Sequence, residues 1–223
     1  MYKILDMNLF LSYLSKFNKP FKFILFYFYM IDCLDKIKFD ILQISDCDLK
    51  NNSKNLVFDK GNFCSEIMFI GEAPGKIEDE IGIPFSGESG ENLNKQLENI
   101  GINPNNCYFT NIVKYRPENN RKPKISEINK YSEFLIRQIN IVKPKVIIPL
   151  GNTASKFCLS GFSCKNMNKV SGMDKIHGKF FEINSYTIFP MYHPSSNVSS
   201  RIRKENFIKD FLKLKEFLKE INN

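Results

Sequence analysis

The sequence predicts an α/β fold built on a largely parallel sheet, because short strand-like runs alternate with helical patterns along the chain. Three apolar runs, at residues 66–70, 107–113 and 146–150, have the length and composition of buried strands. Helical patterns at residues 91–100 and 126–142 separate them. A polar segment follows each run directly, and ligands in such sheets bind beyond the carboxyl ends of the strands.

The remaining segments continue this alternation. Residues 71–90 are expected to form a Gly-rich loop between the first strand and the first helix, and Ser126 is expected to open the second helix as its N-cap. A short helix follows the turn at residues 151–153, and residues 180–192 hold one or two further strands. Residues 205–221 form a closing amphipathic helix rich in Lys and Glu.

The composition is typical of a globular protein with an anionic partner. The 223 residues suffice for one domain with a sizeable core, and 43% of them are hydrophobic. Lys and Arg number 32 against 24 Asp and Glu, which gives a net charge of +8, and nucleic acid is the commonest partner of such a chain. Six cysteines without a C-x-x-C pair argue against a zinc ribbon and for a reducing, cytoplasmic or nucleoid-associated setting.

The most apolar stretch, residues 21–34, does not predict a membrane span. Lys22 and Asp32 interrupt it, and its uncharged part is far shorter than the ~20 residues that a span requires. It also lacks the small-residue cleavage site of a secretory signal. We therefore expect a packed helix or an unstructured extension here, no membrane association and no secretion.

A cluster of acidic residues follows the first strand in the segment GEAPGKIED, residues 71–79. It carries three carboxylates, Glu72, Glu78 and Asp79. A carboxylate at the end of a strand can orient and polarise an attacking water. The alternatives are a phosphate-binding loop or an elaborate turn. The acidity of the segment, and the absence of both G-x-x-x-x-G-K-[ST] and G-x-G-x-x-G, argue against phosphate binding.

Three further positions have side chains suited to binding a nucleobase. Phe85, in the loop GIPFSG, is either a stacking surface for a base or a hydrophobe that anchors its loop. Asn111, at the end of the second strand, offers the donor and the acceptor that suit a pyrimidine edge, and is otherwise a turn residue. His193, followed by Pro-Ser-Ser, is either an active-site donor or a structural loop histidine.

The ordered set GEAPGKIED, GIPFSG, TNIVKYRPENNRKP and HPSSN closely resembles the family 4 uracil-DNA glycosylases, over roughly residues 40–215. The first block is highly specific, whereas the last would be weak alone. The resemblance implies a three-layer α/β/α domain with a central, largely parallel sheet. It also implies an enzyme of base-excision DNA repair that hydrolyses the N-glycosidic bond of a uracil flipped out of DNA and leaves an abasic site.

The resemblance assigns roles to these positions. Phe85 looks like the residue that stacks on the extruded uracil, and Asn111 like the amide that pairs with its Watson–Crick edge. His193 looks like the donor on the O2 side, which stabilises the departing uracil anion. The candidates for positioning the water are, in order of preference, Glu72, Glu78 and Asp79. Further substrate contacts are expected from Gly71, Ala73 and Ser195.

Contacts to the DNA around the flipped base are expected from basic side chains and from one loop. Phosphate contacts would offset the few kcal/mol that flipping a base costs. The candidates are Lys114, Arg116, Arg121, Lys122, Lys175 and Lys179. Family members usually carry a wedge leucine four residues beyond the His of the last motif. Here Asn197, followed by Val198, holds that position, which predicts weaker help with flipping in duplex DNA.

The sequence departs from the family at the positions of an iron–sulfur cluster. Family members usually hold a 4Fe–4S cluster with four cysteines, whereas the matching positions here are Ile44, Cys47, Tyr115 and Tyr131. A cluster needs four converging thiolates, and a tyrosine oxygen is a hard ligand poorly matched to it. We expect no metal or cofactor, with apolar and aromatic packing in the cluster's place.

The resemblance also bears on domain limits and on function. Met30 stands close to the point where family members begin, so residues 1–29 are expected to be an extension and residues 30–223 the glycosylase-like domain. We expect a monomer that acts on uracil-containing DNA. The alternative is a catalytically reduced, DNA-binding or polymerase-associated subunit. The enzyme is favoured because all four motif segments are intact.

Overall fold

The computed structural model describes residues 34–45, 47–195 and 201–220, which fall into two compact units, residues 1–43 and 44–223. In the first unit, residues 34–42 are helical, with Leu34, Ile37 and Ile41 buried. The expected domain start at Met30 lies outside the described residues. No helix in the described ranges combines the length and the apolarity needed to cross a membrane.

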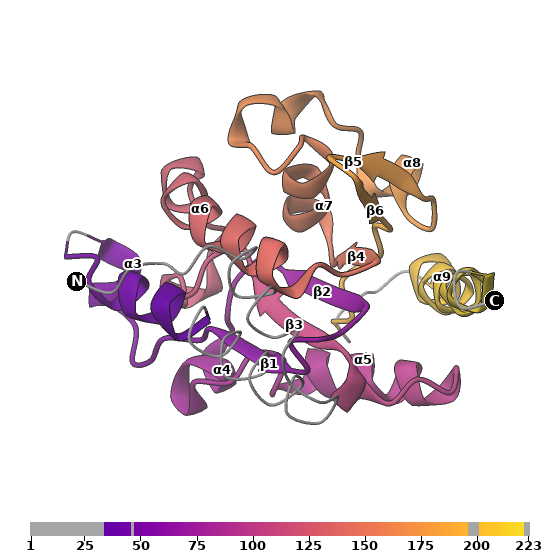
Figure 1. Ribbon diagram of the computed structural model, residues 1–223, viewed down its shortest axis with the longest axis horizontal. Coiled ribbons are helices and arrows are strands. Elements are labelled where there is room, and N and C mark those ends of the chain that lie inside the picture. Colours follow the sequence, from indigo (N-terminus) through magenta and orange to yellow (C-terminus); the bar gives the residue numbers. More distant parts are fainter. Residues whose placement is uncertain (1–33, 46, 196–200, 221–223) are drawn as a thin grey trace, which may run out of the picture. The chain divides into compact units, whose positions relative to one another are not determined.

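The second unit is built on a six-stranded sheet with the strand order β1-β3-β2-β4-β6-β5 (Figure 1). Strands β2, β3, β4 and β6 are parallel, while β1 and β5 pair antiparallel at the two edges. The strands are β1 (Asp59–Gly61), β2 (Ile67–Gly71), β3 (Tyr108–Asn111), β4 (Val146–Pro149), β5 (Phe181–Ile183) and β6 (Tyr186–Ile188). The largely parallel sheet confirms the predicted fold class.

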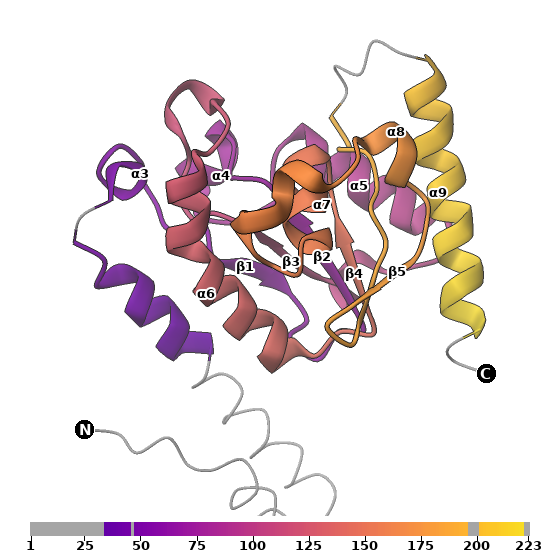
Figure 2. The same cartoon turned by 90° about the horizontal axis from the view of Figure 1, so that it is seen from above.

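Helices cover both faces of this sheet. Figures 1 and 2 show α6 (Ile125–Val142) and α7 (Asn152–Leu159) on one side, with α5 (Glu88–Asn99) on the other, where α9 (Arg201–Glu220) packs beside α5. This arrangement confirms the expected three layers. The shorter elements are α3 (Asp48–Asn51), α4 (Lys76–Ile81), α8 (Met173–Ile176) and the 3₁₀ turns η1 (Pro104–Asn106), η2 (Glu118–Asn120) and η3 (Cys164–Lys169).

The central strands are apolar throughout because both of their faces are covered. Every residue of β2, β3 and β4 is buried. On the α5 side, Phe69 stacks on Phe109 with ring centroids 5.3 Å apart, and Leu93, Leu97 and Phe211 pack into the same cluster. Full burial of each such side chain stabilises the fold by about 1.5–3 kcal/mol. The central strands therefore form a rigid base for the loops at their ends.

Two local expectations were wrong, both at helix starts. The segment 71–90 is not one loop, because α4 lies within it, with Gly75 as N-cap and the Glu78 carboxylate accepting the Gly75 N–H at 3.1 Å. Ser126 is not the cap of α6: that cap is Lys124, whose N–H donates to the Glu127 carboxylate. Such carboxylates three residues into a helix close a capping box.

Candidate active site

The four motif segments meet at the carboxyl edge of the parallel strands. Gly71 at the end of β2 is in register with Asn111 at the end of β3. Beyond β4 and β6, Leu150 pairs with Met191, and the Gly151 N–H donates to the Met191 carbonyl at 2.9 Å. This pairing brings the segment after β6, and with it the His-Pro motif, to the same edge. The polar segments that follow the strands therefore meet at one edge of the sheet.

Gly71, Phe85 and Asn111 are in close contact. A Cβ atom on Gly71 would lie 2.2 Å from Asn111 Oδ1 and 3.0 Å from Phe85 Cζ, so only glycine permits this approach. Phe85 has a left-handed backbone with φ of 53°, which is rare for an aromatic residue and marks a tightly constrained loop. Gly90 shares this constraint, since its Cβ would fall 1.9 Å from the Phe85 carbonyl oxygen.

Phe85 and Asn111 are both buried. Phe85 is only 7% exposed and its ring lies 5.7 Å from that of Phe109, so it packs as a hydrophobe that anchors its loop, one of the two interpretations drawn from the sequence. Asn111 is 4% exposed, and its side-chain amide makes no hydrogen bond to another described residue. A buried amide without a protein partner can exchange its donor and acceptor with a ligand.

Glu72 and His193 lie together in a cavity of about 330 Å³. Residues 151–153 and the segment 117–122 supply most of the remaining lining, together with Ala73. Although His193 reaches the surface, the protein packed around it lowers its pKa by burial, while the negative charges of Glu72 and Glu78 act in the opposite direction. The lowered pKa favours the neutral imidazole, which carries one N–H donor.

Two residues that were not predicted hold the His-Pro segment in place. Gly151, with φ of 83°, lies against His193, because a Cβ there would be 3.3 Å from His193 Cβ. From α5, the Asn92 side chain donates to the Pro194 carbonyl at 2.8 Å. The contact joins positions 102 residues apart, so no local pattern could indicate it. Gly151 could have been found from the sequence, since a turn was predicted at residues 151–153.

The three candidate carboxylates differ in their surroundings. Glu78 accepts from the backbone N–H groups of Gly75, Ser86 and Gly87, at 3.1, 3.2 and 2.9 Å. Asp79 is buried and accepts the N–H groups of residues 54 and 55, at 3.0 and 3.2 Å. In contrast, the Glu72 carboxylate makes no hydrogen bond or ion pair with a described residue. Glu72 therefore has the freest oxygens for a water molecule.

A second cavity, of about 350 Å³, adjoins the first. The two share Gly151, Asn152 and His193, and Ser195 belongs to the second. Here the Tyr192 hydroxyl donates to Asp174 Oδ1 at 2.6 Å. The two cavities flank His193, so a substrate bound at either can reach its imidazole.

The basic residues expected to contact DNA are placed unequally. Arg121 and Lys122 line the cavity of Glu72 and His193, and Arg121 also pairs with Glu127 at 2.8 and 2.6 Å. Arg116 donates to Asn120 Oδ1 at 2.8 Å. Lys175 and Lys179 are exposed but line neither of these two cavities. Asn197 and Val198 lie outside the described residues.

Lys114 does not lie where the sequence placed it. Its side chain is fully buried, at 0% exposure, and its ammonium donates to Thr110 Oγ1 at 2.6 Å and to the Asn111 carbonyl at 2.7 Å. Burial lowers its pKa to about 7, against the opposing effect of the negative Asp59. The expectation of a phosphate contact is wrong for this residue, because no phosphate can reach a buried ammonium.

The four positions that match the family's iron–sulfur ligands supply a single thiol, that of Cys47. Cys47 is buried, with its sulfur 3.0 Å from the Tyr131 hydroxyl, and the rings of Tyr115 and Tyr131 lie 6.2 Å apart. Burial raises the pKa of both tyrosines, which keeps them protonated. These residues do not fit a four-thiolate cluster. Across the described residues, no group of three or more His, Cys, Asp or Glu side chains could hold a metal ion.

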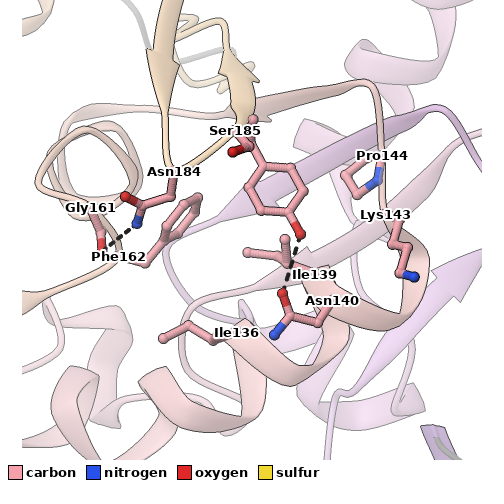
Figure 3. A pocket seen from close by; sticks show the side chains of 10 residues that line it. Ile136, Ile139, Asn140, Lys143, Pro144, Gly161, Phe162, Asn184 and Ser185 are labelled. Carbon is pink, nitrogen blue, oxygen red and sulfur yellow. Dashed lines mark hydrogen bonds between the residues drawn. The ribbon is translucent and has the colours of Figure 1, made fainter. Parts of the chain in front are cut away.

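A third cavity, of about 600 Å³, lies away from these residues (Figure 3). It is lined by the end of α6, by Lys143 and Pro144 before β4, and by the turn between β5 and β6. Asn140, labelled in Figure 3, accepts a hydrogen bond at Oδ1 from the Tyr186 hydroxyl at 3.2 Å. Because Pro144 precedes β4, this cavity is at the amino edge of the strands, and none of the predicted site residues lines it.

Comparison with known proteins identifies the family of this chain. The profile of the uracil DNA glycosylase superfamily matches residues 58–219. Three relatives named type-4 uracil-DNA glycosylase come from Archaeoglobus fulgidus (34% identity, 83% of this chain, 94% of the relative), Saccharolobus solfataricus (38%, 84%, 88%) and Thermotoga maritima (37%, 81%, 92%). The resemblance drawn from the motifs is confirmed, and the chain belongs to the uracil-DNA glycosylase superfamily.

Proposed function

We propose that this protein is a uracil-DNA glycosylase that removes uracil flipped out of DNA and leaves an abasic site. The observation that carries the proposal is the meeting of Gly71, Phe85 and Asn111 at the sheet edge that also bears Glu72 and His193. An aromatic ring suits a pyrimidine, as does an amide that makes no side-chain hydrogen bond to a described residue. A carboxylate without such a bond and a neutral imidazole suit hydrolysis. The names of the relatives support the same activity.

In the proposed mechanism, Phe85 stacks on the flipped uracil and Asn111 pairs with its Watson–Crick edge. The Glu72 carboxylate orients a water molecule and accepts its proton as the oxygen attacks C1′ of the deoxyribose. The bond between C1′ and N1 breaks, and its electron pair leaves with the uracil anion. The His193 N–H stabilises the charge that develops on the O2 side of that anion. Gly71, Ala73 and Ser195 complete the contacts around the base.

The flanking DNA is proposed to lie over the basic residues near the cavities. Arg116, Arg121 and Lys122 occur on or beside the segment that lines the Glu72 cavity, and the net charge of +8 supports phosphate binding. Exposed Lys175 and Lys179 extend this surface in the proposal. Asn197 and Val198 keep their proposed place as a weak wedge. We further propose that the protein acts as a monomer. The described cysteines are all free, which supports a reducing compartment, the one that holds the DNA.

The first test is uracil release from oligonucleotides that carry one uracil, as single strands and as duplexes, followed by alkali. Strand breakage at the uracil and free uracil are expected in the presence of a metal chelator, with none from a matched thymine oligonucleotide. Because a glycosylase must unstack the base, single strands should be cut at least as fast as duplexes. Binding to both substrates without breakage would instead support the reduced, DNA-binding subunit.

The protein is also proposed to fold and act without an iron–sulfur cluster. Protein purified without oxygen should be colourless and lack stoichiometric iron. Cys47→Ala should retain activity within about twofold and lose about 1 kcal/mol of unfolding free energy, because it removes one buried thiol–hydroxyl hydrogen bond. Cys64→Ala, at an exposed cysteine, is the matched control and should change neither. A broad absorbance near ~400 nm with about four irons per chain would contradict this proposal.

A further inference from the structure

Lys114 is a buried ionisable residue that the proposed mechanism leaves without a role. It follows β3 by three residues, and its ammonium is enclosed at the strand end with the Thr110 hydroxyl at 2.6 Å and the Asn111 carbonyl at 2.7 Å. It also lies 5.7 Å from the centre of the Phe58 ring. Burying an ammonium is costly, so an apolar side chain of similar length would fill this space at a lower cost. Packing alone therefore does not explain the buried amine.

The ammonium stands at one end of a buried hydrogen-bond network. The Thr110 hydroxyl donates to the Phe58 carbonyl at 2.8 Å and lies 3.5 Å from Gln138 Oε1. The Gln138 amide donates in turn to the Tyr108 hydroxyl at 2.9 Å, and that hydroxyl donates to an Asp59 carboxylate oxygen at 2.7 Å. The network fixes β3 to the segment of β1 and to α6. Within this network, Lys114 is the residue that also donates to the Asn111 carbonyl.

The peptide that Lys114 holds carries the amide proposed to read uracil. Asn111 has no side-chain hydrogen bond to a described residue, and its Oδ1 is pressed against Gly71. The orientation of the Asn111 side chain is therefore set by the Asn111 backbone and by the steric contact with Gly71. The Lys114 amine donates to the Asn111 carbonyl at 2.7 Å, a bond that either protonation state can make, and this bond restricts rotation of the peptide. Displacements of about 1 Å in such positioning can cost as much as ~100-fold in rate.

We propose that Lys114 is a positioning residue for Asn111: by clamping the Asn111 carbonyl, it holds the Asn111 amide in the orientation that engages the flipped base. The inference rests on the proposed role of Asn111. It assigns Lys114 an effect on the chemical step and on base selection, and none on phosphate binding.

The test compares steady-state kinetics of the full chain on a single-stranded uracil oligonucleotide. Lys114→Met keeps the length of the side chain and removes both hydrogen bonds. We expect kcat to fall by at least ~10-fold, with KM for DNA and its salt dependence unchanged, because a residue that touches no phosphate contributes nothing to counterion release. A raised KM with an altered salt slope and a normal kcat would overturn the proposal.

A matched control separates positioning from stability. Gln138→Leu breaks the same buried network at a site that does not touch Asn111. It should lower the melting temperature but keep kcat within about twofold at temperatures where the protein is folded. If Lys114→Met does not fold, Lys114→Gln, which keeps a polar end but is too short to retain both bonds, takes its place. An unchanged kcat in the variant that folds would overturn the proposal.

A double-mutant cycle with Asn111→Ala decides whether Lys114 acts through Asn111. In the Asn111→Ala background, Lys114→Met should cause little further loss of kcat, since the amide that it positions is already gone. Multiplying losses would show that Lys114 acts elsewhere and would overturn the inference. An Asn111→Ala variant with wild-type activity would instead refute the proposed role of Asn111 itself.

Discussion

Glu72→Gln is expected to lower kcat for uracil release by at least ~100-fold while the protein stays folded and binds DNA normally. The glutamine keeps the shape of the side chain but cannot accept the proton of the attacking water. Glu72 has no structural hydrogen bond to lose among the described residues, so its melting temperature should change little. The measurement is single-turnover cleavage with enzyme in excess, alongside thermal unfolding.

Glu78→Gln is the control for Glu72→Gln, because Glu78 is the second candidate for positioning the water. The Glu78 carboxylate accepts three backbone N–H groups, so its substitution should cost about 1–3 kcal/mol of stability through weakened charged hydrogen bonds. At temperatures where the variant is folded, it should lose much less activity than Glu72→Gln. The reverse ranking, a 100-fold loss at Glu78 and a small one at Glu72, would assign the water to Glu78.

His193→Ala is the second substitution expected to cost about 100-fold or more in kcat, because it removes a donor aimed at developing negative charge. His177→Ala is the matched control, as His177 is the other histidine of the chain. That side chain bonds the buried Asp210 at 2.8 Å, so its loss should reduce stability and leave kcat within a few fold. Equal losses of kcat in both variants would refute the donor role of His193.

The pH dependence of stability and of kcat should both reflect the lowered pKa of His193. Burial lowers its pKa below the usual value near 6.5, so the imidazole is neutral above that pH in the folded and the unfolded chain. Between the two pKa values the unfolded chain binds more protons. The stability linked to this group is therefore present above pH ~6.5 and is lost as the pH falls through the lowered pKa. Wild-type kcat should therefore not decline as the pH rises through 6.5. A decline there that His193→Ala abolishes would show that the protonated imidazole is the active form.

The sequence predicted the sheet well because its central strands are apolar on both faces and are short. It failed where the deciding contact is distant or depends on three-dimensional burial. Lys114 looked like a surface charge, since nothing in its neighbours indicates that Thr110 and the Asn111 carbonyl enclose it. The contact of Cys47 with Tyr131, across 84 residues, was predicted only because the family resemblance placed both residues at one site. The Gly75 and Glu78 spacing, in contrast, was a readable capping signal within a segment taken for a loop.

The Glu78 carboxylate also links two parts of the chain into one cooperative unit. It ties Gly75, at the start of α4, to Ser86 and Gly87, which directly follow Phe85. Fraying of α4 is therefore expected to release the backbone beside Phe85, the ring proposed to stack on the base, while the sheet beneath stays intact. We therefore expect the free energy of opening this short helix, rather than that of global unfolding, to set the fraction of molecules whose proposed site can receive a base.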